Sequence, residues 1–206
     1  MSRKLVRRHL SVPFLFYRGR YPLLMHYSAG LTLTELVVSL SIMATLSTAG
    51  ASSFQHLISN SRVDALAMSL RTDLMFVRSE AINRGQRVLL CRQGAAPDSC
   101  AGSSSSGQLS WQQGWLVFVD ANNDSQLSLS NGDQILRVQQ PLNSQLQVKW
   151  NRGDFIGYQG SGALSSLNGT FCVGDWSGDS SLHRELVLPH SGRLRTARVE
   201  CRYSFP

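Results

Sequence analysis

Apolar residues in the first quarter of the chain form one long uncharged stretch. Residues 36–54 read LVVSLSIMATLSTAGASSF, and no Asp, Glu, Lys or Arg lies between Glu35 and Arg62. About 20 helical residues, rising about 1.5 Å each, cover the roughly 30 Å hydrocarbon layer of a bilayer. This stretch is therefore predicted to be a helix that crosses a membrane once.

The apolar pattern after this stretch is that of an amphipathic helix, because large apolar residues return at steps of three or four. Glu80 and Arg84 stand four residues apart, and Gly85 is suited to end the helix. We predict one helix over about 32–84, roughly 80 Å long. Its core-facing side chains are Val63, Leu66, Leu70, Leu74, Val77 and Ala81.

Beyond Gly85 the pattern changes to short β-type runs separated by Gly, Asn, Ser and Pro. One long helix followed by antiparallel strands predicts an α+β domain, with the sheet packed on the second half of the helix. The strands are expected near 87–92, 115–120, 134–138, 145–150, 170–174, 185–188 and 193–201.

The positive charge of the chain is concentrated at its start. The sequence has 20 Lys and Arg against 13 Asp and Glu, and six of the basic residues but no acid lie in residues 1–30. The positive-inside rule then predicts a cytoplasmic N-terminus and an exported C-terminal part. The remaining chain is nearly neutral, so an argument for nucleic-acid binding must rest on local clustering.

The start of the apolar stretch carries the motif GLTLTE, from Gly30 to Glu35. A carboxylate at the edge of a bilayer is costly unless it has a partner, so Glu35 is a candidate functional residue. The sequence GLTLTELVVSLSIMATL resembles the class III signal of type IV pilins and pseudopilins. The resemblance implies that a prepilin peptidase cuts between Gly30 and Leu31 and methylates the new amine. It also implies that Glu35 neutralises the terminal amine of a neighbouring subunit.

Two features differ from that family, and a plain signal anchor is the alternative. Leu31 stands where the family usually has Phe, and a 30-residue leader is long. Met25 is an alternative start, which would leave the leader MHYSAG without Lys or Arg.

The body of the chain resembles the GspH/FimT group of minor pseudopilins and minor pilins. The matching stretches are LRTDLMFVRSEAINRGQRVLLC (70–91), WQQGWLVFVDANND (111–124) and LPHSGRLR (188–195). The resemblance implies a leader at 1–30, a transmembrane and assembly half of the helix at 31–57, and a periplasmic head at 58–206. The implied partners are the prepilin peptidase, other pilin or pseudopilin subunits and the inner membrane.

Four cysteines lie on the exported side, where disulfides persist. Three connectivities are possible, and we favour Cys91–Cys100, which closes a small loop, with Cys172–Cys201, which ties the last strand to an earlier one. A zinc site is the less favoured alternative, because no C-x-x-C occurs and the histidines lack ligand spacing.

Neither a cofactor nor a catalytic centre is predicted. Hydrolase, metalloprotease, P-loop and dinucleotide motifs do not occur in the sequence. The run from Asp120 to Asp124 imitates the opening of a calcium loop, but Ser125 replaces the turn glycine and Asn131 stands in place of the bidentate Glu. We interpret it as a solvated turn, with an adhesin or metal-dependent binder as a third possibility for function.

Basic residues cluster near the C-terminus, and all of them are arginines, which suit phosphate contacts. A charged strand edge that prevents strand pairing is the alternative explanation. Gly192-Arg193-Leu194-Arg195 resembles the G-R-x-R signature of the FimT branch, which takes part in DNA uptake. By that resemblance Arg193 and Arg195 contact phosphates and Gly192 supplies the turn. Further candidates are Arg184, Arg198, Arg202, Lys149 and Arg152.

The sequence thus favours a minor type IV pilin that binds DNA non-specifically for uptake in natural transformation. It would sit in the inner membrane, N-terminus cytoplasmic and head periplasmic, before joining a filament. The alternative is a structural GspH-like minor pseudopilin of type II secretion without DNA binding.

Overall fold

A computed structural model describes residues 30–177, 179–198 and 201. The chain divides into two compact units, residues 1–46 and 47–206. The helix α1 (Leu33–Arg84) begins and ends within a residue of the predicted limits. Gly85 follows it with a φ of 64°, the left-handed conformation expected after a helix end.

The described part of the first unit is the beginning of α1. Its apolar side chains are exposed, from Leu33 at 80% to Leu46 at 67%. Within the described residues no helix is both long enough and apolar enough to cross a membrane, so the predicted span is not confirmed.

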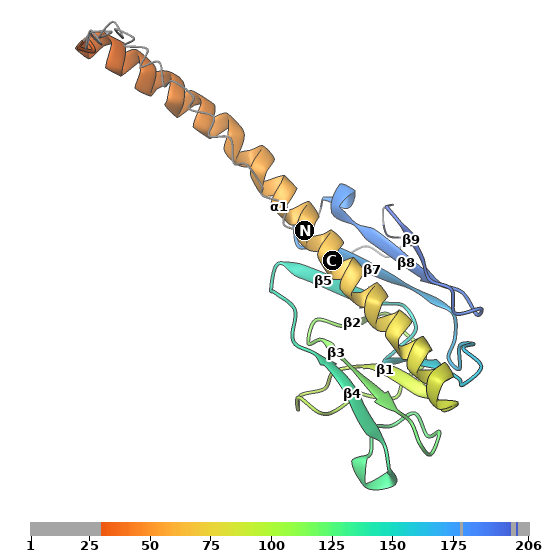
Figure 1. Ribbon diagram of the computed structural model, residues 1–206. Coiled ribbons are helices and arrows are strands. Elements are labelled where there is room, and N and C mark those ends of the chain that lie inside the picture. The colour runs from red at the N-terminus through yellow and green to blue at the C-terminus, as the bar shows by residue number, and fades with distance from the viewer. Residues whose placement is uncertain (1–29, 178, 199–200, 202–206) are drawn as a thin grey trace, which may run out of the picture. The chain divides into compact units, whose positions relative to one another are not determined.

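The second unit contains two antiparallel sheets, where the sequence predicted one (Figure 1). The first has the order β4-β3-β1-β6, and the second β2-β5-β7-β8-β9. The strands of the first are β1 (Val88–Arg92), β3 (Trp115–Val119), β4 (Gln134–Gln139) and β6 (Phe155–Tyr158). Those of the second are β2 (Leu109–Ser110), β5 (Leu146–Trp150), β7 (Gly169–Asp175), β8 (Arg184–Leu188) and β9 (Arg195–Ala197), and short 3-10 helices lie at Leu129–Asn131 and Ser180–Leu182.

The second half of α1 lies across both sheets (Figure 1). All six apolar residues predicted to face the core are buried and belong to one cluster with side chains of both sheets. A smaller cluster, which includes Leu89 and Phe118, covers the opposite face of the first sheet. Strands β1 and β3 are therefore buried on both faces, which explains their continuous apolar runs.

Two aspartates of α1 pair with arginines of the sheets. Asp73 accepts hydrogen bonds from Trp115 Nε1 at 2.8 Å and Arg137 Nη1 at 2.5 Å, at the first sheet. Asp64 accepts one from Arg184 Nε at 2.6 Å, at the second sheet. Their partners lie 42 to 120 residues away in the sequence, so spacing along the helix could not reveal them.

The predicted disulfides are confirmed as Cys91–Cys100 and Cys172–Cys201. The second closes a loop with a sequence separation of 29, which contributes about 3 to 4 kcal/mol in the chain-entropy account. The predicted final strand is too long, because among the described residues of 193–201 only Arg195–Ala197 form β9. Strands β2 and β6 were not predicted.

Candidate nucleic-acid interface

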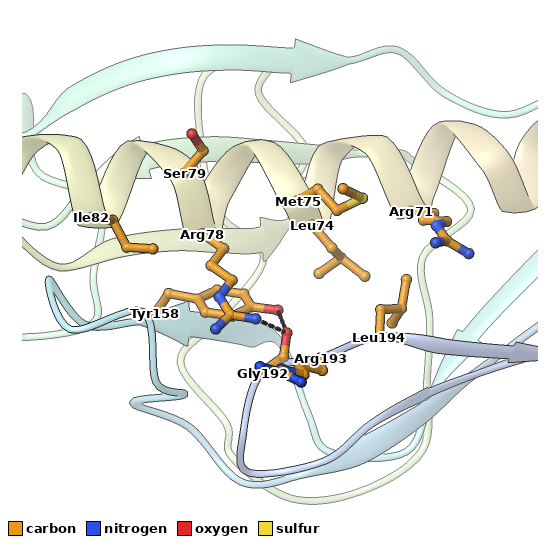
Figure 2. Close-up of a pocket in the computed structure, with 10 residues that line it drawn as sticks. All are labelled: Arg71, Leu74, Met75, Arg78, Ser79, Ile82, Tyr158, Gly192, Arg193 and Leu194. Atoms are coloured by element: carbon orange, nitrogen blue, oxygen red, sulfur yellow. Dashed lines mark hydrogen bonds between the residues drawn. The ribbon is translucent and has the colours of Figure 1, made fainter.

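A left-handed glycine turns the chain between β8 and β9. Gly192 is buried, has a φ of 69°, and donates its N–H to the Pro189 carbonyl at 2.8 Å. Its own carbonyl accepts hydrogen bonds from Arg78 Nη1 of α1 at 3.1 Å and from the Tyr158 hydroxyl of β6 at 3.3 Å (Figure 2). One carbonyl thus ties the arginine-bearing segment to the helix and to the first sheet.

Tyr158 stays a hydrogen-bond donor over the whole physiological range of pH. Its side chain is almost fully buried, and burial raises the pKa of the hydroxyl to about 12. The neutral phenol therefore remains available to hold the Gly192 carbonyl.

A pocket of about 370 Å³ lies where α1 meets the turn (Figure 2). Three arginines line it, Arg71 and Arg78 from α1 and Arg193 from the turn, and the lining contains no acidic residue. Apolar side chains, including those of Met75 and Ile82, form the rest of the wall. The pocket is therefore both cationic and apolar.

A second pocket, of about 450 Å³, continues along the same side of the helix towards β9, and Arg71 lines both. Its wall includes Thr196, Arg198 and Asp64. We call the two pockets together the α1–β9 groove. The arginines along it are Arg71, Arg78, Arg193 and Arg198, with Arg184 beneath.

The arginines of this region differ in their partners. Arg184 is buried and occupied by Asp64, Asn60 and two backbone carbonyls. The hydrogen bond from Arg184 is the main cause of a lowered pKa of Asp64. Arg184 is thus a structural residue, and its inclusion among the DNA-binding candidates is wrong because its guanidinium is not accessible.

Arg198 is exposed but shares Asp64, at 3.4 Å. By contrast, within the described residues, Arg71, Arg193 and Arg195 form no ion pair with a carboxylate. These three guanidinium groups are exposed, and they contribute to the local positive charge together with Arg78, which donates to a carbonyl. Arg202 lies outside the described residues.

The candidates divide between two faces of the second sheet. Arg195 of β9 lies opposite Val187 of β8. Leu186, the residue before Val187, points into the core, so Val187 and Arg195 share the other face of the sheet. Arg195 therefore lies on the face directed away from α1. Strand alternation predicts that Arg193 and Arg195 share one face, but Arg193 precedes β9 and lines the pocket beside α1, so the two arginines lie on different faces.

Lys149 and Arg152 lie farther from the groove. Lys149 is on β5, with β7 and β8 between it and β9, which places it about 14 Å from the β9 backbone. It is half-buried, and burial lowers the pKa of its ammonium group. Arg152 is exposed and donates to the Asn168 carbonyl at 3.2 Å.

The two arginines of α1 that line the groove were not predicted from the sequence. Arg71 and Arg78 are seven residues apart, as are the exposed residues Met68, Met75 and Ile82. A step of seven keeps residues on nearly the same side of a helix. This row of arginines and exposed apolar residues, next to the row that faces the core, is the sequence pattern that could have indicated the groove.

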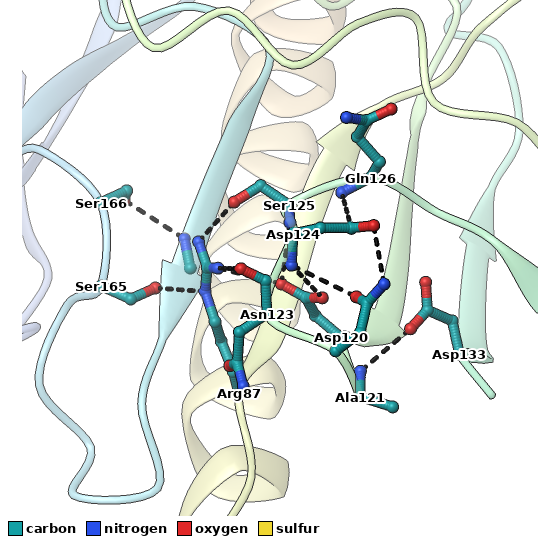
Figure 3. A network of polar contacts seen from close by, with 12 residues as sticks. Arg87, Asp120, Ala121, Asn123, Asp124, Ser125, Gln126, Asp133, Ser165 and Ser166 are labelled. Atoms are coloured by element: carbon teal, nitrogen blue, oxygen red, sulfur yellow. Dashed lines mark hydrogen bonds and ion pairs between the residues drawn. The ribbon is translucent and has the colours of Figure 1, made fainter. Parts of the chain in front are cut away.

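The acidic turn is organised by an arginine (Figure 3). Asp120 accepts hydrogen bonds from the N–H groups of Asp124 and Ser125, both at 3.2 Å, and pairs with Arg87 Nη1 at 3.0 Å. Burial raises the pKa of Asp120. The guanidinium of Arg87 thus supplies the positive charge that a calcium ion would bring, and within the described residues no cluster of His, Cys, Asp and Glu suits a metal.

The predicted processing and assembly residues lie at the start of α1. Gly30 and Leu31 are exposed and precede the helix. Thr32 Oγ1 accepts the Glu35 N–H at 3.3 Å, so Thr32 caps the helix and Glu35 occupies its first turn, where the helix dipole favours an acid.

Comparison with known proteins identifies a family model and solved structures of similar fold. The model described as type II transport protein GspH matches residues 66–192. Two crystal structures of the type IV minor pilin FimU of Pseudomonas aeruginosa strain PAO1 are 17% and 15% identical, with TM-scores of 0.47 and 0.48. They match 65% and 69% of this chain and 91% and 90% of FimU.

The minor pseudopilin EpsH of the type 2 secretion system of Vibrio cholerae is 16% identical, with a TM-score of 0.46 over 66% of this chain and 97% of EpsH. No curated protein matches the sequence.

The Gly192 turn can be tested against a matched glycine. A Cβ at Gly192 would lie 2.7 Å from Tyr158 Cε1 and 3.0 Å from the Gly162 carbonyl oxygen, whereas a Cβ at Gly85, at a similar φ of 64°, meets no atom within 4 Å. Gly85→Ala should therefore cost about 1 kcal/mol of unfolding free energy from backbone strain alone. Gly192→Ala should cost about 2 to 4 kcal/mol, because overpacking adds to the strain. Urea unfolding followed by circular dichroism measures both, and equal losses would contradict the close packing of the turn.

Proposed function

The chain belongs to the GspH family of type II transport proteins, and on that premise we propose that it is a minor pilin that binds DNA through the α1–β9 groove and through Arg195, which lies on the opposite face of β9. The head carries the DNA-binding surface, and the first part of α1 joins the filament. DNA bound in this way would be taken up in natural transformation.

The observation that supports DNA binding is the contrast among the arginines. Arg184 and Arg198 are engaged by Asp64, whereas Arg71, Arg193 and Arg195 have no acidic partner within the described residues. Unpaired guanidinium groups on a neutral body attract phosphates, which they contact in fork geometry. Such contacts give affinity without base readout, as a receptor for DNA of any sequence requires.

Few contacts make each subunit a weak binder. Three to five arginines give affinity that falls steeply with salt. Several binding heads along a filament, or at its tip, would raise the effective affinity by avidity.

A purely structural role is the second candidate function, and the family description favours it. The matching model is that of a type II transport protein, a minor pseudopilin in our interpretation, for which DNA binding is not needed. In that role the arginines would only protect the β9 edge from strand pairing.

Assembly is assigned to the beginning of the mature chain. A prepilin peptidase would cut between Gly30 and Leu31, and the uncharged start of α1 would lie in the inner membrane before it joins other subunits. The exposed apolar side chains of residues 31–46 support burial against lipid or neighbouring helices. Glu35 would then pair with the terminal amine of a neighbour, because an ion pair lowers the cost of burying either charge.

This assembly role predicts a specific effect of neutralising Glu35. Glu35→Gln should remove the chain from sheared filaments while leaving its amount in the membrane fraction unchanged, because the neighbour's amine loses its partner. Glu80→Gln is the control, since Glu80 pairs with Arg84 on the same helix. Immunoblots of the two fractions measure the distribution. Equal incorporation of both variants would refute the role of Glu35.

The DNA-binding role predicts a loss of affinity and of salt dependence. Arg193→Ala/Arg195→Ala in the full chain should weaken duplex binding and reduce the slope of log affinity against log salt by about two. Fluorescence anisotropy at two salt concentrations measures this.

The control double variant is Arg62→Ala/Arg84→Ala, which removes equal charge from exposed sites that lie neither in the groove nor on β9. Equal losses in both double variants would mean that net charge alone binds DNA. An absence of binding by the wild type at low salt would favour the structural role.

A further inference from the structure

The groove contains an apolar pocket that phosphate contacts alone do not require. Met75 and Ile82 are 57% and 49% exposed, and they line the 370 Å³ pocket together with Leu74 and Leu194. A duplex presents phosphates and sugars to such a surface and keeps its bases stacked inside. Exposed apolar walls between arginines therefore point to a ligand with an apolar part next to its anionic groups.

We propose that this pocket receives an unpaired nucleobase, so that the groove prefers single-stranded to duplex nucleic acid. The inference rests on the proposed DNA-binding function and specifies its ligand. Single-strand sites combine a basic groove that follows the backbone with side chains, most of them aromatic, that contact the faces of the bases. In this pocket the aliphatic side chains of Met75 and Ile82 would make those contacts. The pocket also lies within the range of about 300 to 1,000 Å³ that small-molecule sites occupy.

The arginines around the pocket suit the two parts of such a ligand. Arg71 and Arg193 have no acidic partner within the described residues, so their planar groups can stack on a base or contact the adjoining phosphates. Arg71 and Arg78 are seven residues apart on α1, about 10 Å along the helix axis. Arg78 donates one hydrogen bond to the Gly192 carbonyl, which fixes the position of its side chain in the wall of the pocket.

Charge complementarity favours a polyanion as the occupant. The lining contains three arginines and no acidic residue. The one acidic residue of the neighbouring pocket, Asp64, is paired with Arg184 and Arg198. The groove therefore carries arginines along its length, from Arg78 in the first pocket to Arg198 in the second.

Three oligonucleotides separate the contributions of bases and phosphates. Anisotropy titrations would use the full-length chain in dodecyl maltoside with a single strand of 15 nucleotides, the same strand as a duplex, and an abasic strand of equal length. The single strand should bind more tightly than either other ligand, because only it offers unpaired bases.

Shortening the apolar wall should then act on the single strand alone. Met75→Ala/Ile82→Ala should lower single-strand affinity about tenfold, because a bound base would cover less apolar surface, and should leave duplex and abasic binding unchanged. The matched control is Leu129→Ala/Leu167→Ala, which shortens two similarly exposed apolar side chains outside both pockets.

The outcomes distinguish this inference from the function on which it rests. Equal binding of all three ligands, with no effect of Met75→Ala/Ile82→Ala, would overturn the base pocket and leave backbone binding intact. Failure of the wild type to bind any of the ligands would refute both.

Discussion

The burial of one apolar face of α1 against two antiparallel sheets is the interaction on which the rest of the structure depends. Leu70, Leu74 and Val77 are at most 1% exposed, and each such side chain contributes about 1.5 to 3 kcal/mol. The same helix begins at Leu33, far from the sheets in the sequence, and ends at Arg84 beside them. Packing in the head therefore decides which side of the helix remains open to a ligand.

The exposed side of α1 forms a groove with the segment that lies beside it. The stripe that contains Arg71, Met75 and Arg78 adjoins the core-facing stripe, so the buried face brings it to the β9 edge of the second sheet. The Gly192 carbonyl, held by Arg78 and Tyr158, joins that edge to the helix and to the first sheet. Two distant segments thereby form one cationic groove, although the body of the chain is almost neutral.

Local patterns in the sequence predicted most of the helix and strand positions, but they did not predict the contacts between segments that are distant in the sequence. The helix limits, its buried face and seven of the strands follow from periodicity and turn residues, and both favoured cysteine pairs are correct. The division into two sheets was not predictable, because strand order depends on pairing between remote segments. Strand β6 is only four residues long and contains Gly157, so it did not stand out.

The site was predicted only in part for the same reason. The G-R-L-R motif indicated Arg193 and Arg195 as candidate residues. A short motif does not show which helix packs beside it in the folded chain. Arg184 was a further candidate on charge alone, yet it is buried and pairs with Asp64, 120 residues away. Arg71 and Arg78 join the groove through the packing of α1, and no local clustering of charge marked them.

Hydrogen exchange of the full chain with and without an oligonucleotide tests the central claim most directly, because it maps the bound surface without changing a residue. The account predicts that, at low salt, DNA slows amide exchange in residues 190–198 and leaves the acidic turn at 120–133 unchanged. Slowed exchange centred on 120–133, or no slowing at 190–198 under conditions where DNA is bound, would contradict it.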